Sequence, residues 1–175
     1  VLSGSDLIAG YFSESSLPPL ADEPADGPVD MICAMDVVQR RPDPRAFLRE
    51  MLARLRPGGL LILTCRSGSG FDILTLREHS DSIFPLDHIC LPSPQGMQLL
   101  LEETGFKLLE LATPGLLDAQ FVKEAADKIP KDQYFQRYLT TFCDEIILEK
   151  LQMFLQHSNL SSHMRVVAQR PTGSP

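Results

Sequence analysis

The sequence predicts a single α/β domain built on an open, doubly wound and mostly parallel sheet. Near-continuous apolar runs at 29–37 and 60–65 are typical of strands that are covered on both faces. An amphipathic segment lies between these runs, and a second helix and strand follow at 94–112. Because strands alternate with helices along the chain, the strands are expected to pair in parallel.

The first strand, helix and strand are predicted within residues 29–65. Asp43 can cap the helix, and Pro44 suits its first turn. Five apolar positions fall on one helical face: Phe47, Leu48, Met51, Leu52 and Leu55. Pro57-Gly58-Gly59 is expected to end the helix directly before the strand at 60–65.

A further helix and strand are predicted after a long excursion of the chain. Ser93 and Pro94 can begin this helix, whose apolar positions are Met97, Leu100 and Leu101. Gly105 is placed to end it, since glycine readily adopts the left-handed conformation found just past helix ends. A strand is then expected at 106–112.

The remainder of the chain is predicted to be more helical. Asp118 can cap a helix that Pro130 ends. One longer helix should follow, with an apolar stripe that packs in the core or against a partner chain: Phe135, Leu139, Phe142, Ile146 and Phe154. A strand at 164–168 closes the domain. The earlier Ser67-Gly68-Ser69-Gly70 is interpreted as a flexible loop, because it lacks the lysine of a phosphate-binding loop.

The composition narrows the class of partner. The 175 residues are 43% hydrophobic, with a formal charge of −7 and no dense cluster of Lys and Arg, which argues against nucleic-acid binding. No apolar run is long enough to cross a bilayer and no leader-like segment is recognisable, so a cytoplasmic protein without membrane contact is expected. Widely spaced cysteines and isolated histidines predict reduced, buried thiols and no metal site.

A series of short segments then points to a family. In chain order they are VDMICAMDVV at 29–38, DP at 43–44, FL at 47–48, LRPGGLLILT at 55–64, FPLDH at 84–88, SP at 93–94, LLEETGF at 100–106 and SSHMRVVA at 161–168. Their order and spacing resemble the carboxyl-terminal half of class I S-adenosylmethionine-dependent methyltransferases, from about Val29 to Pro171.

The resemblance implies a Rossmann-like, seven-stranded sheet whose last strand is antiparallel. It also implies S-adenosylmethionine as the cofactor, lying across the carboxyl ends of the strands. The activity implied is transfer of a methyl group from the cofactor's sulfonium to a nucleophile, here expected on a small-molecule substrate. An alternative is a non-catalytic module of the same ancestry, retained for packing or for binding a partner.

Two departures from the family pattern support that alternative. Relatives open with a strand and a GxGxG turn, and neither is found upstream of Val29. We therefore expect residues 1–175 to form one amino-terminally incomplete methyltransferase-like domain, lacking the first strand and helix, with a loop at 13–28. A missing amino-terminal segment or another chain would then complete the sheet. In addition, Val38-Gln39-Arg40 stands where many relatives have Leu-Glu-His, so a familiar proton acceptor is lost.

Candidate cofactor-binding residues lie where strands are expected to end. Asp36, with Ala34 and Met35, follows the first predicted strand, and open α/β sheets bind ligands at the carboxyl ends of strands. Asp36 could instead cap the next turn or pair with a neighbouring arginine. Asp6, in Gly4-Ser5-Asp6-Leu7-Ile8, resembles the family's acidic residue that accepts hydrogen bonds from ribose, but it could equally be a solvated loop acid or a cap.

The candidate catalytic residues are His88 and Asp87. They lie in the excursion between the second predicted strand and the next helix, a region that covers the substrate in this family. Asp87 could orient the imidazole for proton transfer. The alternative is an ordinary histidine in a surface loop.

Overall fold

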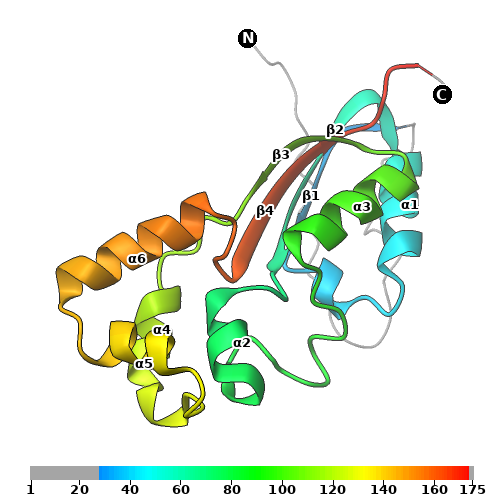
Figure 1. Ribbon diagram of the computed structural model, residues 1–175. Coiled ribbons are helices and arrows are strands. Elements are labelled where there is room, and N and C mark those ends of the chain that lie inside the picture. Colours follow the sequence, from blue (N-terminus) through cyan, green and yellow to red (C-terminus); the bar gives the residue numbers. More distant parts are fainter. Residues whose placement is uncertain (1–27, 174–175) are drawn as a thin grey trace.

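A computed structural model describes residues 28–173 as a four-stranded sheet with helices on one face and a small helical unit beyond one end (Figure 1). The strands are β1 (Val29–Met35), β2 (Leu55–Arg66), β3 (Lys107–Ala112) and β4 (His163–Gln169), and their order across the sheet is β1-β2-β4-β3. Asp6 and nearly all of the loop expected at 13–28 lie outside the described residues.

The directions of the strands agree with the predicted fold class. β1 and β2 are parallel, with Met35 paired to Thr64, whereas β4 runs antiparallel to both of its neighbours, β2 and β3. Three strands therefore run in one direction and the last runs in the other. A mostly parallel sheet with an antiparallel closing strand is confirmed.

Two capped helices cover one face of the sheet. In α1 (Pro44–Arg54) the Asp43 carboxylate accepts a hydrogen bond from the Ala46 amide at 2.9 Å. In α3 (Pro94–Thr104) the Ser93 hydroxyl accepts from the Gly96 amide at 3.0 Å, and Gly105 ends the helix with a φ of +94°. The starts of both helices and the closing glycine of α3 are as predicted.

The core lies between these two helices and the sheet. Seven side chains from the two central strands are completely buried there: Leu55, Leu61, Leu63, Cys65, Met164, Val166 and Ala168. The strands were predicted to be covered on both faces, and within residues 28–173 that is wrong. On the other face of β1, Met31 and Met35 are 49% and 50% exposed and Cys33 is exposed as well.

Pro57-Gly58-Gly59 does not end α1. The helix ends at Arg54, and the three residues lie within β2, where the register with β1 slips between the pairs Val29–Leu55 and Met31–Leu60. Gly58 has a φ of +83°, which favours glycine. A side chain at Gly59 would lie only 2.9 Å from the Arg56 carbonyl oxygen, so the glycines serve a bulge in the strand.

The helical region after β3 is more broken than predicted. α4 (Asp118–Glu124) ends before Pro130, and the expected long helix is two helices, α5 (Tyr134–Thr141) and α6 (Glu145–His157). The break occurs where the Asp144 carboxylate caps α6 by accepting from the Ile147 amide at 2.9 Å. The apolar stripe is not in the core, because most of its members are exposed: Phe135, Phe142, Ile146 and Phe154.

Short helical segments that were not predicted connect these elements. They are α2 (Phe71–Leu76) after β2 and three 3-10 turns, η1 (Val38–Arg40), η2 (Arg77–His79) and η3 (Ala126–Lys128). Segments this short have too few residues to show a helical period. Within the described part of the chain, no helix has the length and apolar character needed to span a membrane.

Asp118 does not cap α4 as predicted. Its carboxylate is 3% exposed and accepts hydrogen bonds from Ser161 Oγ at 2.5 Å, the Ser162 amide at 2.6 Å and Gln152 Nε2 at 2.7 Å, and also from Ser162 Oγ. Burial by itself raises the pKa of Asp118, but these hydrogen bonds outweigh it, so the net pKa is lowered. One carboxylate thereby joins α4, α6 and the segment that enters β4.

Replacing Asp118 by Asn is expected to destabilise the fold in a pH-dependent way. Because the folded-state pKa is below the ordinary value, the carboxylate stabilises the fold above that value, and the stabilisation is lost as pH falls through the folded pKa. Urea unfolding should show Asp118→Asn less stable than the unmodified chain by about 1.5–3 kcal/mol at pH 7, with the gap narrowing below about pH 4.

The exposed Asp127 offers a matched control, and Asp127→Asn should leave the unfolding curve unchanged within about 0.5 kcal/mol. If the free energy of unfolding differs between Asp118→Asn and the unmodified chain by as much at pH 3 as at pH 7, the charged carboxylate is not what stabilises the fold.

Candidate functional site

Asp36 lies at the carboxyl end of β1, at the edge where β1 and β2 both end. Its amide donates to the Thr64 carbonyl oxygen at 3.0 Å and lies 3.1 Å from the Thr64 hydroxyl oxygen. Its φ of +54° is uncommon for a residue with a side chain, and it turns the chain out of the sheet directly after Met35. The carboxylate of Asp36 accepts from Gln39 Nε2 at 3.5 Å.

The two residues before Asp36 face opposite sides of the sheet. Ala34 is 4% exposed and packs in the core beneath α1 and α3, so its side chain cannot reach a ligand at the edge. Met35 is half-exposed on the uncovered face, with its sulfur 3.6 Å from the Thr64 hydroxyl. Of the three predicted cofactor-side residues described, only Asp36 and Met35 offer side chains to a ligand.

His88 and Asp87 are brought together with Arg40, a contact that the sequence did not predict. Arg40 pairs with the Asp87 carboxylate at 3.0 Å, and His88 Nε2 lies 3.5 Å from the same carboxylate. The other ring nitrogen, Nδ1, lies 2.8 Å from the Ser82 carbonyl oxygen. Only 11% of the His88 side chain is exposed, so the imidazole lies largely buried between the Ser82 carbonyl oxygen and the Asp87 carboxylate.

The segment that carries His88 is attached to the strand edge through Gln39. The Gln39 carbonyl oxygen accepts from the amides of Ile89 and Cys90 at 2.7 and 3.0 Å. Gln39 is 1% exposed, and its Nε2 is the group that reaches Asp36. Gln39 therefore links the two candidate halves of the site, a role with no signal in the sequence because it is carried mainly by a backbone carbonyl.

Ser67-Gly68-Ser69-Gly70 packs tightly against neighbouring backbone. A side chain on Gly68 would collide with the Leu91 carbonyl oxygen, and one on Gly70 would lie 2.6 Å from Ser162 Cα. The Ser67 amide donates to the Ser162 carbonyl oxygen at 2.8 Å. These glycines are needed for close approach of two chain segments.

The pKa of Cys65 depends on the groups that surround it near this edge. Burial, together with the charge of Asp36 and the neighbouring Cys90 thiol, raises the pKa of Cys65 to about 12. Such a thiol is a poor nucleophile. All four cysteines are free, but the expectation that they are buried holds only for Cys65, since Cys33 is exposed and Cys90 and Cys143 are partly exposed.

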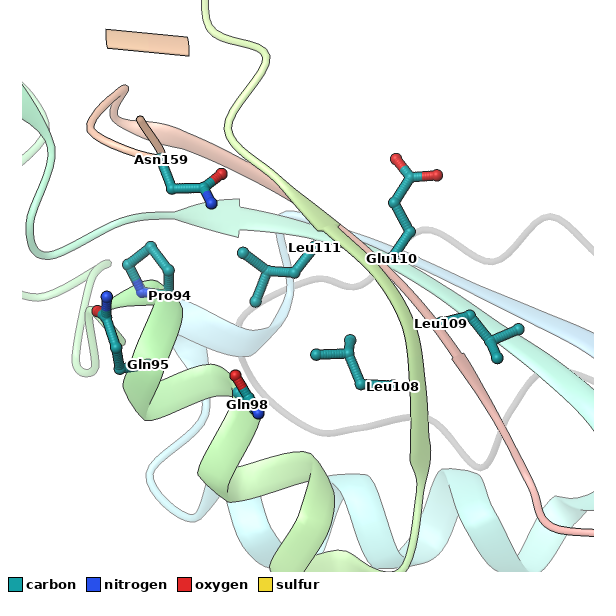
Figure 2. A pocket seen from close by; sticks show the side chains of 8 residues that line it. All are labelled: Pro94, Gln95, Gln98, Leu108, Leu109, Glu110, Leu111 and Asn159. Carbon is teal, nitrogen blue, oxygen red and sulfur yellow. The ribbon is translucent and has the colours of Figure 1, made fainter. Parts of the chain in front are cut away.

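Two surface pockets lie away from this edge. One, of about 360 Å³, lies between α3 and β3 at the opposite side of the sheet from β1, and its apolar wall is formed by Leu108 and Leu111 (Figure 2). The other, of about 520 Å³, lies between α4 and α6. Neither is lined by Asp36 or His88, and no group of side chains suited to a metal ion occurs among residues 28–173.

Comparison with protein-family models decides the family. Residues 10–111, more than half of the chain, match the model described as "Methyltransferase domain". The chain belongs to this methyltransferase domain family. A search of curated protein sequences finds no significant match.

Solved structures share the methyltransferase fold at low sequence identity. One match is a Haloferax volcanii structure of the Trm112 methyltransferase activator in complex with a protein named as a methyltransferase. The TM-score is 0.52 and the sequence identity is 19%, over 88% of this chain and 59% of that one. A protein from Bacillus halodurans that is named as a methyltransferase gives a TM-score of 0.50 and 17% identity, over 86% of this chain and 68% of that one. A protein from Galdieria sulphuraria that is named as a sarcosine dimethylglycine methyltransferase gives a TM-score of 0.49 and 16% identity, over 84% of this chain and 55% of that one.

At these identities the likeness to the Haloferax volcanii and Bacillus halodurans structures establishes the fold. The methyltransferase domain described here spans only a little over half the length of the Haloferax and Galdieria chains. The four strands of residues 28–173 correspond to part of the Rossmann-like methyltransferase sheet.

Proposed function

We propose that this chain takes part in transfer of a methyl group from S-adenosylmethionine to a small-molecule acceptor. The observation that carries the proposal is the arrangement at the carboxyl ends of β1 and β2. There the strained Asp36 and the half-exposed Met35 lie next to the segment that holds His88. Family membership supports methyl transfer in general, and this edge is where open α/β sheets bind ligands.

The chemistry of these residues fits a nucleoside-type cofactor along one wall. Met35 offers an exposed apolar side chain, and Asp36 offers a carboxylate that can accept hydrogen bonds from hydroxyl groups. When bound, S-adenosylmethionine would supply an electrophilic methyl group for in-line displacement, promoted mainly by positioning of the two reactants.

His88 would act on the acceptor. The Ser82 carbonyl oxygen can only accept a hydrogen bond, so Nδ1 of the neutral ring carries the hydrogen and Nε2 is left with its lone pair. Nε2 could take a proton from the acceptor, and the Asp87 carboxylate 3.5 Å away would stabilise the resulting charge. A neutral ring that carries its hydrogen on Nε2 would contradict this role.

The non-catalytic module is the second candidate. It is favoured by the positions of the two pockets described above, since neither is lined by Asp36 or His88. Loss of the imidazole at Arg40 favours it as well, because a guanidinium stays protonated and cannot accept a proton.

Calorimetric titration with S-adenosylhomocysteine tests the choice between the two candidates. Saturable binding below about 1 mM is expected for the 175-residue chain, and Asp36→Ala should weaken it about tenfold by removing one charged acceptor. Asp30 offers a matched control at the other end of β1, where it pairs with Arg56 at 2.5 Å. Asp30→Ala should bind as the unmodified chain does, and absence of saturable heat from all three proteins would support the non-catalytic module.

We further propose that a segment of the same protein or a second chain covers the open face of β1. The apolar side chains Met31 and Met35 with the exposed Cys33 support this, because a sheet face of this kind is ordinarily covered. The Haloferax volcanii protein was solved in complex with a methyltransferase activator, so a protein of similar fold binds a second chain.

Thiol labelling tests whether that face is open in the chain itself. Iodoacetamide at pH 8 should modify Cys33 at least about tenfold faster than Cys65, which is buried and has its pKa raised to about 12. Mass spectrometry of the peptides gives both rates in one sample, and unfolding should equalise them. Equal protection of Cys33 and Cys65 in the folded chain would contradict an open face.

A further inference from the structure

A second buried carboxylate, that of Asp72, lies next to the segment that carries His88. Asp72 is in the first turn of α2 and is 4% exposed. Its Oδ2 atom accepts hydrogen bonds from the hydroxyls of Ser80 at 2.7 Å and Ser82 at 2.5 Å, and both serines are buried. Two donors therefore converge on one carboxylate oxygen inside the protein, where an unbonded carboxylate would be costly.

The two serines continue the contact towards His88. The Ser82 amide donates to the Ser80 hydroxyl oxygen at 3.1 Å, and the Ile83 amide donates to the Ser80 carbonyl oxygen at 3.0 Å. The Ser82 carbonyl oxygen is the atom that accepts from His88 Nδ1 at 2.8 Å. Asp72 is thus linked to the imidazole through Ser82, whose hydroxyl donates to the carboxylate and whose carbonyl oxygen accepts from the ring.

We propose that Asp72 is a positioning residue for His88. By holding the hydroxyls of Ser80 and Ser82, it fixes the direction of the Ser82 carbonyl, and that carbonyl fixes the tautomer of the ring with the hydrogen on Nδ1. Nε2 is then kept bare and directed to the side on which Asp87 and Arg40 lie. The assignment rests on the proposed role of His88 as a proton acceptor and adds the residue that prepares it.

The local hydrogen bonds favour this role over simple packing. The backbone of His88 is held separately, because its amide donates to the Phe84 carbonyl oxygen at 2.8 Å and the next two amides donate to Gln39. Asp72 is therefore not needed to keep the segment attached to the strand edge. Its contacts are to the hydroxyl of Ser82, the residue whose carbonyl oxygen meets the imidazole, and to the hydroxyl of Ser80.

The test is nitrogen NMR of the histidine rings in the full 175-residue chain, recorded at a pH where the rings are neutral. The unmodified chain should show His88 mainly as the Nδ1–H tautomer. In Asp72→Ala the ratio of Nδ1–H to Nε2–H should fall about fivefold to tenfold, as expected for loss of one net hydrogen bond. Asp72→Asn should restore most of the ratio, because its amide oxygen can still accept from both serines.

Two controls separate positioning from general damage. His157 Nδ1 also lies close to a carbonyl oxygen, that of Met153 at 2.6 Å on α6, and its signals should not change in any variant. Thr75→Ala alters another buried polar side chain on α2, one with no hydrogen-bond partner among the described residues, and should leave His88 unchanged. His88→Gln assigns the ring signals.

A folded Asp72→Ala chain in which His88 keeps the unmodified tautomer ratio would overturn the proposal. If Asp72→Ala does not fold, Ser82→Ala replaces it, since it removes one donor to Asp72 while leaving the carbonyl, and an unchanged ratio there would overturn the proposal equally. Failure of the proposed function looks different: S-adenosylhomocysteine would not bind, whereas the tautomer ratios would still respond to Asp72.

Discussion

The buried carboxylate of Asp118 connects parts of the chain that the sheet alone does not hold together. It binds Ser161 and Ser162 at the entrance to β4 and Gln152 on α6, while lying at the start of α4. A buried charge of this kind is tolerated only when its acceptor sites are filled, and here four donors fill them. This one group therefore helps to fix the position of the helical unit relative to the sheet.

The same entrance to β4 holds the segment that leads to the candidate site. The Leu160 and Ser162 carbonyl oxygens accept from the amides of Phe71 and Ser67, which fixes the start of α2. α2 carries Asp72, and Asp72 binds the serines next to His88. Hydrogen bonds joined by short stretches of backbone therefore lead from Asp118 to the imidazole, through residues that are distant in the sequence.

Local sequence patterns predicted the sheet and its two covering helices well. The apolar runs, the caps at Asp43 and Ser93 and the glycine at Gly105 are decided by neighbouring residues, and all of them have the expected structure. Asp118 was misinterpreted because an Asp at a helix start looks the same whether it binds its own helix or residues more than 40 positions away. The break before α6 was missed because apolar periodicity continues across it although the side chains are exposed.

The candidate site was predictable in its location but not in its contacts. Asp36 follows a clear strand, so its place at the carboxyl edge could be inferred from the sequence. The pairing of Arg40 with Asp87 and the backbone link from Gln39 to Ile89 join segments about 50 residues apart. No local pattern encodes such contacts, since they depend on how the segment before α3 returns to the strand edge.

Methionine methyl NMR during titration with S-adenosylhomocysteine shows whether the cofactor lies against the exposed end of β1. The chain has six methionines in different surroundings. A cofactor bound there should cause a saturable shift of the Met35 methyl signal, with no change at the buried Met97 and Met164 or at Met153 on α6. A Met35 signal that stays unchanged up to about 1 mM ligand, or changes confined to Met153, would contradict it.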